Sequence, residues 1–225
     1  MAPKVAGKGT ASTTLYGEPR TGMKVVAVLI ADAATVNVTM RGATLLAHAL
    51  RGLREAGCVD RTVVSVPPDE GTALGEDYRV VAAAPTRAES IWRAFEAAGS
   101  CDVVLVHDAA RAFVPPATIR AVAEAVFGGA EAAAPALPVT DTVKLVGPGD
   151  VVTATEDRAR LRTVQTPFGF VADVLREACE RGVDPLSSPP RTVRAVAGHP
   201  NGLRLATPFD VAVAEALLNE EGVRS

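Results

Sequence analysis

Apolar runs of strand length alternate with amphipathic stretches along most of the chain. The apolar runs lie at 24–30, 61–66, 79–84 and 102–108, and helical patterns lie at 44–57, 87–99 and 116–127. Buried strands that alternate with amphipathic helices are typical of a mostly parallel sheet with helices on both faces. The pattern therefore predicts one α/β domain over residues 23–225.

Two of the predicted helices carry start signals. Thr86 and Glu89 form a T-x-x-E capping box, in which each side chain accepts the backbone N–H of the other residue. Thr207, followed by Pro208 and Asp210, begins a last helix in the same manner, with proline at its first position. We expect one helix to begin after Thr86 and another after Thr207.

The segment from Asp141 to Phe170 breaks the alternation of strands and helices. Residues 141–146 and 151–156 are strand-like, and the turn sequence GPGD between them predicts a hairpin. A two-stranded hairpin is marginally stable in water unless something packs on it. We therefore expect a β-arm over about 139–168 that joins two copies of the chain as a homodimer.

Composition excludes several classes of partner. The net charge of −3 and the aromatic content of 4% leave no basic excess and few platforms for stacking bases, so we expect no nucleic acid. The first 22 residues lack the apolar run of a secretory signal, and no later segment reaches the roughly 20 apolar residues of a membrane span. We expect a cytoplasmic protein with no membrane association and a disordered N-terminal arm over residues 1–22.

The cysteines suggest no metal site. Cys58, Cys101 and Cys179 are widely separated, and neither a C-x-x-C pair nor a histidine lies at metal-ligand spacing from them. We interpret them as reduced core thiols.

The sequence VVLVHDAARAFVPP, residues 103–116, holds the first candidate for chemistry. Asp108 and Arg111 lie just beyond the carboxyl end of a buried strand, where open α/β sheets bind ligands. A carboxylate there can hold Mg²⁺, which prefers a few hard oxygen ligands together with phosphates. The alternative is that Asp108 caps the following turn and Arg111 pairs with it. The residues alone leave both interpretations open.

Two further polar clusters lie on or near the predicted arm. Arginine offers bidentate donors to a phosphate and threonine offers a hydroxyl, so both clusters suit a sugar phosphate. The alternative is a solvated hairpin surface. The first cluster holds Asp141, Thr142 and Lys144, and the second holds Arg158, Arg162, Gln165 and Thr166.

The order of these clusters resembles that of a known family. LVHDAAR, LPVTDTVK, DRARLRTVQTP and GLRLATPFDVAVAEALL are similar to segments of the 2-C-methyl-D-erythritol 4-phosphate cytidylyltransferase family of the non-mevalonate isoprenoid pathway. The resemblance runs from about Lys24 to Leu218. It implies a Rossmann-like nucleotidyltransferase fold and a dimer joined by exchanged β-arms. It also implies Mg²⁺-dependent reaction of CTP with methylerythritol phosphate, which gives the cytidyl diphosphate product and pyrophosphate.

The resemblance also assigns roles to individual residues. Asp108 would hold the metal in catalysis, and Arg204 in GLRLATP would stand where the family has a second catalytic lysine. Arginine keeps that charge but changes its geometry. The remaining roles are nucleotide binding by Ser90 and Ala109, and substrate binding by Arg111, Thr142, Arg158 and Thr166.

The segment between the first strand and the first helix departs from the family. Family members have there a loop of the form A-A-G-x-G-x-R and then a Pro-Lys pair, which together wrap the triphosphate. Here IADAATVNVTMRG, residues 30–42, holds no glycine before Gly42 and no arginine before Arg41, and the chain has no lysine between Lys24 and Lys144. In addition, Ala83–Pro85 replace a Gly-Gly-Asp run that contacts the cytosine.

Two functions are compatible with this sequence. One is a divergent, dimeric family member with weak or no cytidylyl transfer that binds a phosphorylated metabolite or a protein. The other is an active nucleotidyltransferase that makes CDP-methylerythritol or a related conjugate from CTP and a sugar or polyol phosphate. In that case Arg41 or Arg87, with Mg²⁺ on Asp108, would replace the missing loop. Losing one preorganised donor to a developing charge costs roughly 100 to 1,000-fold in rate, which favours the first.

Overall fold

The fold is built on one mixed β-sheet. The structure is a computed structural model that describes residues 22–68, 70, 78–189 and 191–223, so the predicted N-terminal arm lies outside the described residues except for Gly22. Within the described part the sheet has eight strands in the order β10-β7-β11-β6-β1-β4-β5, with β12 beside β7. Their bounds are β1 Val25–Ile30, β4 Arg61–Val66, β5 Arg79–Ala82, β6 Val103–Asp108, β7 Ala132–Pro138, β10 Arg162–Val164, β11 Phe168–Val171 and β12 Val193–Ala197.

Parallel pairing dominates the sheet, as the sequence predicts. Strand β1 pairs in parallel with β4 and β6, β4 with β5, and β7 with β12. Strands β10 and β11 run antiparallel to their neighbours β6 and β7. The alternation of apolar runs therefore predicted the α/β class correctly, but it did not indicate the two antiparallel strands.

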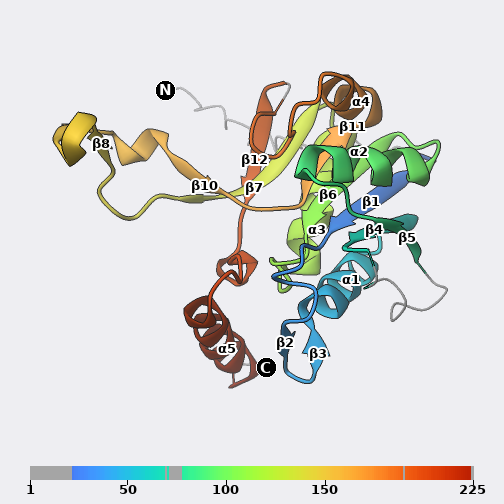
Figure 1. Ribbon diagram of the computed structural model, residues 1–225, viewed down its shortest axis with the longest axis horizontal. Coiled ribbons are helices and arrows are strands. Elements are labelled where there is room, and N and C mark those ends of the chain that lie inside the picture. Colours follow the sequence, from blue (N-terminus) through green and yellow to red (C-terminus); the bar gives the residue numbers. More distant parts are fainter. Residues whose placement is uncertain (1–21, 69, 71–77, 190, 224–225) are drawn as a thin grey trace, which may run out of the picture.

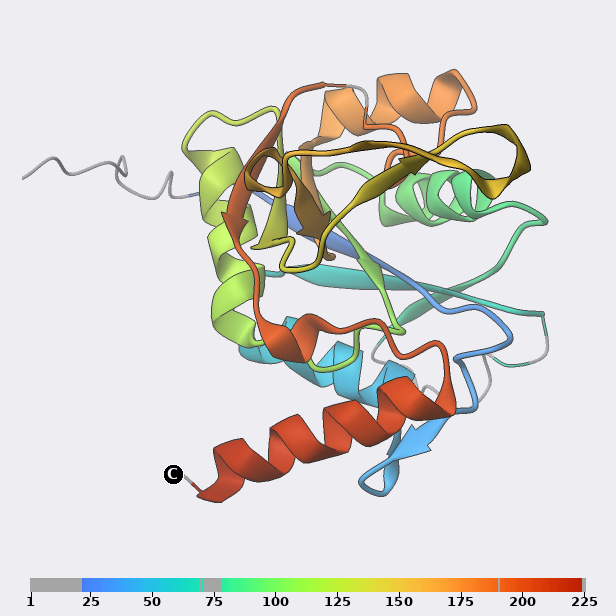
Figure 2. The same cartoon turned by 90° about the vertical axis from the view of Figure 1, so that its left-hand side faces the viewer.

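Helices cover both faces of the sheet (Figures 1 and 2). Helices α1 (Leu45–Glu55) and α3 (Pro116–Phe127) pack on one face, and α2 (Arg87–Ala98) and α4 (Ala172–Glu180) pack on the other. Helix α5 (Pro208–Val223) packs beside the sheet, in a separate small cluster with Met40 and Leu45. Two apolar cores thus hold the strands rigid between helices.

The predicted helix starts are confirmed. The hydroxyl of Thr86 accepts the Glu89 N–H at 3.2 Å, and the Glu89 carboxylate accepts the Thr86 N–H at 3.3 Å. The same exchange joins Thr207 and Asp210 at 3.2 and 2.8 Å, and α5 begins at Pro208. Each exchange satisfies backbone donors that a helix start leaves without a partner.

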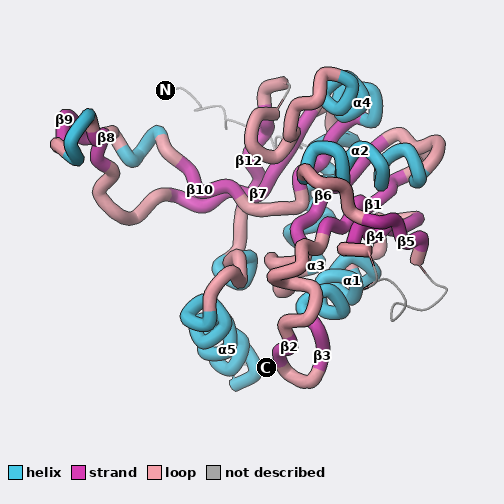
Figure 3. Tube along the Cα trace, in the orientation of Figure 1, coloured by secondary structure: helices cyan, strands magenta, loops and turns pink. Residues whose placement is uncertain are grey.

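A hairpin projects from the sheet where the sequence predicts the arm (Figures 1 and 3). It consists of β8 (Lys144–Val146) and β9 (Val152–Thr155), joined by the 3-10 helix η2 (Pro148–Asp150). The chain then returns through the 3-10 helix η3 (Arg158–Arg160) to β10, which pairs with β7. The projecting part is therefore shorter than residues 139–168.

The segment between β1 and α1 holds a second, smaller hairpin. Strands β2 (Thr39–Met40) and β3 (Ala43–Thr44) pair through the two-residue turn Arg41–Gly42. Both turn residues have positive φ, +51° and +78°, as a type I′ turn requires. Arginine is not a residue that favours this conformation. The short segment is thus an ordered turn and hairpin in place of a phosphate-wrapping loop.

The cysteines lie at the margins of the cores. All three are free and half-buried, and they pack against the two cores rather than inside them. Burial raises the pKa of Cys179 to about 11 and also raises the pKa values of Cys58 and Cys101, which keeps them as inert thiols. Among the described residues, no helix is long and apolar enough to cross a membrane.

One histidine is buried in the central sheet. His107 on β6 is 1% exposed, and its Nδ1 lies 2.8 Å from the hydroxyl of Thr166. Burial lowers the pKa of His107 from 6.5 to about 4, although the neighbouring Asp108 opposes this shift. The ring is therefore neutral at pH 7 in the folded protein.

This pKa predicts loss of stability in acid. Between pH 6.5 and pH 4 the unfolded chain binds a proton at His107 that the folded protein does not bind, so stability falls as the pH falls through this window. The shift corresponds to about 3 kcal/mol of unfolding free energy. Urea unfolding across this range should show a weaker pH dependence in His107→Asn, whose side chain can still reach Thr166, than in the wild type. Identical pH dependence in the two proteins would contradict a neutral, buried His107.

Candidate functional site

The site lies where the order of strands in the sheet reverses. From β1 the chain adds β4 and β5 on one side and then places β6 on the other side. Open α/β sheets bind ligands in the crevice at the carboxyl ends of the strands beside such a switch point. Ile30 at the end of β1 pairs in register with Asp108 at the end of β6. Asp32, two residues beyond Ile30, therefore comes to the same edge as Asp108.

An arginine joins these two carboxylates. The Arg204 Nε donates to Asp108 Oδ2 at 2.9 Å, and an Arg204 Nη lies 3.5 Å from Asp32 Oδ2. The side chain of Asp108 is 19% exposed, whereas those of Arg204 and Asp32 are 41% and 54% exposed. Thr35 fixes the second carboxylate, since its hydroxyl donates to Asp32 Oδ1 at 2.7 Å. The family resemblance names both Asp108 and Arg204 as catalytic candidates, and the structure places them in contact. It predicts no role for Asp32.

The alternative interpretation of Asp108 and Arg111 is half right. The other carboxylate oxygen of Asp108 accepts the Ala110 N–H at 2.9 Å, so it does cap the following turn. Arg111 instead donates to the carbonyls of Gly202 at 2.6 Å and Val164 at 3.2 Å. Burial lowers the pKa of Arg111, while the charge of Asp108 opposes that shift. The hydrogen-bond partner of Asp108 is Arg204, and Arg111 ties the site to two other segments.

Thr166 holds the backbone of Asp108 in place. Its hydroxyl accepts the backbone N–H of Asp108 at 3.1 Å and also contacts His107, and the residue is 6% exposed. Gln165 beside it holds the 3-10 helix η4 (Pro200–Gly202) through its amide, which donates to the His199 carbonyl at 2.8 Å and accepts the His199 N–H at 3.0 Å. These two residues of the predicted substrate cluster therefore position the ends of β6 and β12.

A cavity of about 470 Å³ opens beside Asp32. It lies over the carboxyl ends of β1, β4 and β5, and residues 30–33, 67–68, 83–87 and 90 line it. Ser90 is 3% exposed, and its hydroxyl accepts the Ala84 N–H at 2.9 Å and donates to the Thr86 carbonyl at 2.9 Å. The predicted nucleotide contact at Ser90 thus lines the cavity, while its hydroxyl holds the wall of the cavity in shape.

The other residues predicted to contact the nucleotide or its phosphates lie in different places. Ala109 is fully buried, and its N–H donates to the Ile30 carbonyl at 2.9 Å. Arg87 lines the cavity but pairs with Asp184, at 2.8 Å from its Nε. Arg41 lies on the small hairpin and donates to Asn219 on α5. Arg87 is thus at the switch-point cavity with its charge paired, whereas Arg41 lines a different cavity.

Two predicted substrate residues lie on the projecting arm. Thr142 is exposed just before β8, and Arg158 on η3 donates to the Thr140 carbonyl. Lys144 donates to the Thr155 hydroxyl across the same hairpin at 2.6 Å. Within one chain the arm points away from the sheet, so these residues do not join Asp108 (Figure 1).

The residues at the switch point offer a divalent cation the carboxylates of Asp108 and Asp32, both already paired with Arg204. Among the described residues, no group of three or more histidine, cysteine or acidic side chains could hold a metal. Both carboxylate oxygens of Asp108 already accept hydrogen bonds, one from Arg204 and one from Ala110. A metal on Asp108 would share the carboxylate with Arg204 and with the Ala110 N–H, and substrate phosphates would have to supply its other ligands.

Comparison with known proteins agrees with the geometry. A model of the 2-C-methyl-D-erythritol 4-phosphate cytidylyltransferase family matches residues 28–220. A protein of that name from Saccharopolyspora erythraea is 42% identical over 199 residues, which cover 80% of this chain and 89% of the relative. One from Rhodococcus jostii is 40% identical over 195 residues, which cover 81% and 86%.

Solved structures of related proteins have the same fold as this chain. The cytidylyltransferase from Thermus thermophilus superposes with a TM-score of 0.75 at 30% identity, covering 88% of this chain and 100% of that chain. A 4-diphosphocytidyl-2C-methyl-D-erythritol synthase superposes with a TM-score of 0.76, also at 30% identity, covering 87% and 99%. The chain therefore belongs to the 2-C-methyl-D-erythritol 4-phosphate cytidylyltransferase family of the isoprenoid pathway.

Proposed function

We propose that this chain is a divergent member of its family, with weak or no cytidylyl transfer, that works as a dimer binding a phosphorylated metabolite. The observation that carries the proposal is the bridge from Arg204 to Asp32 and Asp108. The cationic group that stands in place of the family's lysine is neutralised by two carboxylates. The segment that would wrap a triphosphate is a short turn and hairpin.

Electrostatics oppose a triphosphate at this edge. Asp32 is fixed by Thr35 and lines the cavity, so a phosphate entering beside it meets a like charge. Two unit charges about 5 Å apart repel by about 3 kcal/mol at an effective dielectric constant of about 20. Arg204 offsets part of this cost, but its charge is already shared between Asp32 and Asp108. Weak nucleotide binding follows from this arrangement.

The arm supports the homodimer in this proposal. Leu145, Val146, Val151 and Val152 on the hairpin are 47–60% exposed. A two-stranded hairpin with apolar side chains exposed is stabilised when another surface packs on it, and a second copy of the chain is the partner we propose. The arm would then carry Thr142 and Arg158 to the partner's Asp108 edge, where they can bind the phosphate of a sugar or polyol phosphate.

A second function is favoured by the cavity and by the relatives. The 470 Å³ cavity at the ends of β1, β4 and β5 has the size of a small-molecule site, and relatives about 40% identical are named cytidylyltransferases. In an active enzyme an acceptor phosphate oxygen would bond to the α-phosphorus of CTP while the bond to pyrophosphate breaks. Mg²⁺ would supply charge neutralisation at Asp108, and Arg204 would then turn toward the phosphates.

Pyrophosphate release distinguishes the two functions. The purified protein is supplied with Mg²⁺, methylerythritol phosphate and each of the four nucleoside triphosphates, beside the Saccharopolyspora relative and an Asp108→Asn variant. We expect turnover to lie about 10⁴-fold below that of the relative, because at least two charge-stabilising groups are lost together. Turnover close to that of the relative, and abolished by Asp108→Asn, would instead establish the active enzyme.

Retained metabolite binding has its own test. Methylerythritol phosphate should raise the melting temperature of the dimer, because a ligand that binds only the folded state stabilises it. Arg158→Ala should abolish this shift, whereas Arg160→Ala, on the same 3-10 helix and likewise exposed, should preserve it. An unchanged shift in Arg158→Ala would contradict the assignment of the arm to the acceptor phosphate.

A further inference from the structure

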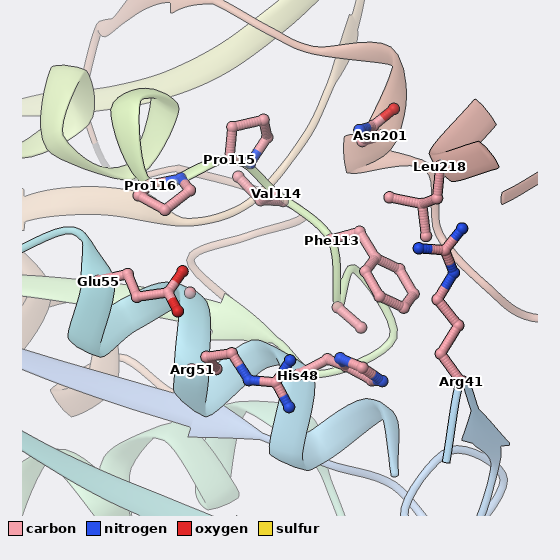
Figure 4. Close-up of a pocket in the computed structure, with 12 residues that line it drawn as sticks. Arg41, His48, Arg51, Glu55, Phe113, Val114, Pro115, Pro116, Asn201 and Leu218 are labelled. Carbon is pink, nitrogen blue, oxygen red and sulfur yellow. The ribbon is translucent and has the colours of Figure 1, made fainter. Parts of the chain in front are cut away.

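We propose that a second cavity, separate from the site at the switch point, binds a small organic anion with one oxyanion group and an apolar body. The cavity has a volume of about 340 Å³ and lies between α1, residues 112–116, the β2–β3 turn and α5 (Figure 4). It shares no lining residue with the cavity beside Asp32. Its volume falls within the range of small-molecule sites.

Two arginines and a histidine line this cavity. Arg41 comes from the hairpin, and His48 and Arg51 come from α1. Figure 4 shows Arg51 beside His48, with Arg41 at the other side of the Phe113 ring. Arg51 is exposed, and in the described part of the chain it makes no hydrogen bond or ion pair. A guanidinium with free donors matches the paired oxygens of a phosphate or a carboxylate.

Arg41 occupies a position that costs free energy. Its φ of +51° is the left-handed conformation that glycine and asparagine favour, at a cost of about 1 kcal/mol or more for other residues. The conformation sets its guanidinium at the mouth of the cavity, where one nitrogen donates to Asn219. An arginine has five N–H donors, so most of them stay available to a ligand.

The floor of the cavity is held in place by His48. Its Nε2 lies 2.8 Å from the Met40 carbonyl, and since a carbonyl only accepts, Nε2 carries the proton. The ring lies against Phe113, with centroids 4.7 Å apart. Val114, Pro115 and Leu218 also line the cavity and, with Phe113, form its apolar wall. A ligand with an apolar body would bury that body against this wall.

Glu55 limits the charge of the ligand. It lines the cavity one helical turn beyond Arg51, and Figure 4 shows it at the opposite side of the cavity from Arg41. A second anionic group on the ligand would approach this carboxylate and be repelled. The lining therefore fits a ligand that is anionic at one end and neutral at the other.

Two segments of the cavity wall continue directly into the switch-point site. Ala112 and Phe113 follow Arg111, and Asn201 precedes Gly202, whose carbonyl accepts Arg111. A backbone hydrogen bond of 2.8 Å from Leu205 to Ala110 ties these segments together next to Arg204. An occupant of the cavity thus contacts the segments that carry both arginines of the first site, which makes it a candidate effector.

Two probes with the same ring and different oxyanions test this site. Phenyl phosphate and benzoate are titrated into the full-length protein by calorimetry, with benzyl alcohol as the uncharged control. We expect at least one anion to bind and the alcohol not to bind, and the tighter anion identifies the ligand as a phosphate or a carboxylate. Arg51→Ala should weaken the binding of that anion about tenfold or more.

The matched control is Arg54→Ala. Arg54 is an exposed arginine on the same helix that does not line this cavity, so its loss should leave probe affinity unchanged. The inference is overturned if neither anion binds up to about 10 mM, a limit near 3 kcal/mol of binding free energy. It is overturned equally if Arg51→Ala binds as the wild type does, or if both variants lose affinity alike. None of these outcomes depends on cytidylyl transfer.

Discussion

The parallel pairing of β1 with β6 brings two carboxylates to one edge of the sheet, and the arginine between them organises the rest of the site. Asp108 ends β6, Asp32 follows β1, and Arg204 arrives from the segment before α5. Among the described residues, Arg204 is the cation that pairs with both carboxylates. The backbone hydrogen bond from Leu205 to Ala110 and the apolar contacts of α5 with Met40 and Leu45 hold the neighbouring segments in place.

Some of this arrangement could be predicted from the sequence. The apolar runs indicate the parallel strands because both faces of those strands are buried, and the capping pairs Thr86–Glu89 and Thr207–Asp210 mark where helices begin. Asp108 stood out because it ends a buried strand. Asp32 occupies the equivalent place after β1, but without a known register between β1 and β6 nothing in the sequence showed that the two residues meet.

Other features depend on tertiary contacts that have no local pattern. Strand β11 is only four residues long, and its antiparallel pairing with β6 and β7 arises because the chain returns from the arm into the middle of the sheet. The hairpin around Arg41 was not foreseen, since arginine is an unusual first residue for a type I′ turn. The same hairpin closes one side of the second cavity. One unusual segment therefore removes a phosphate loop from the first site and helps to build the second.

In the proposed function, Asp32 is the group that keeps a nucleoside triphosphate out of the site. Calorimetric titration of CTP with Mg²⁺ into the wild type and Asp32→Asn measures this directly, with Glu180→Gln, an exposed residue at the end of α4, as a variant of equal charge change. Removing the carboxylate should tighten CTP binding by about tenfold or more, and Glu180→Gln should leave it unchanged. Tight binding to the wild type that Asp32→Asn weakens would contradict the account, because Asp32 would then help to hold the nucleotide.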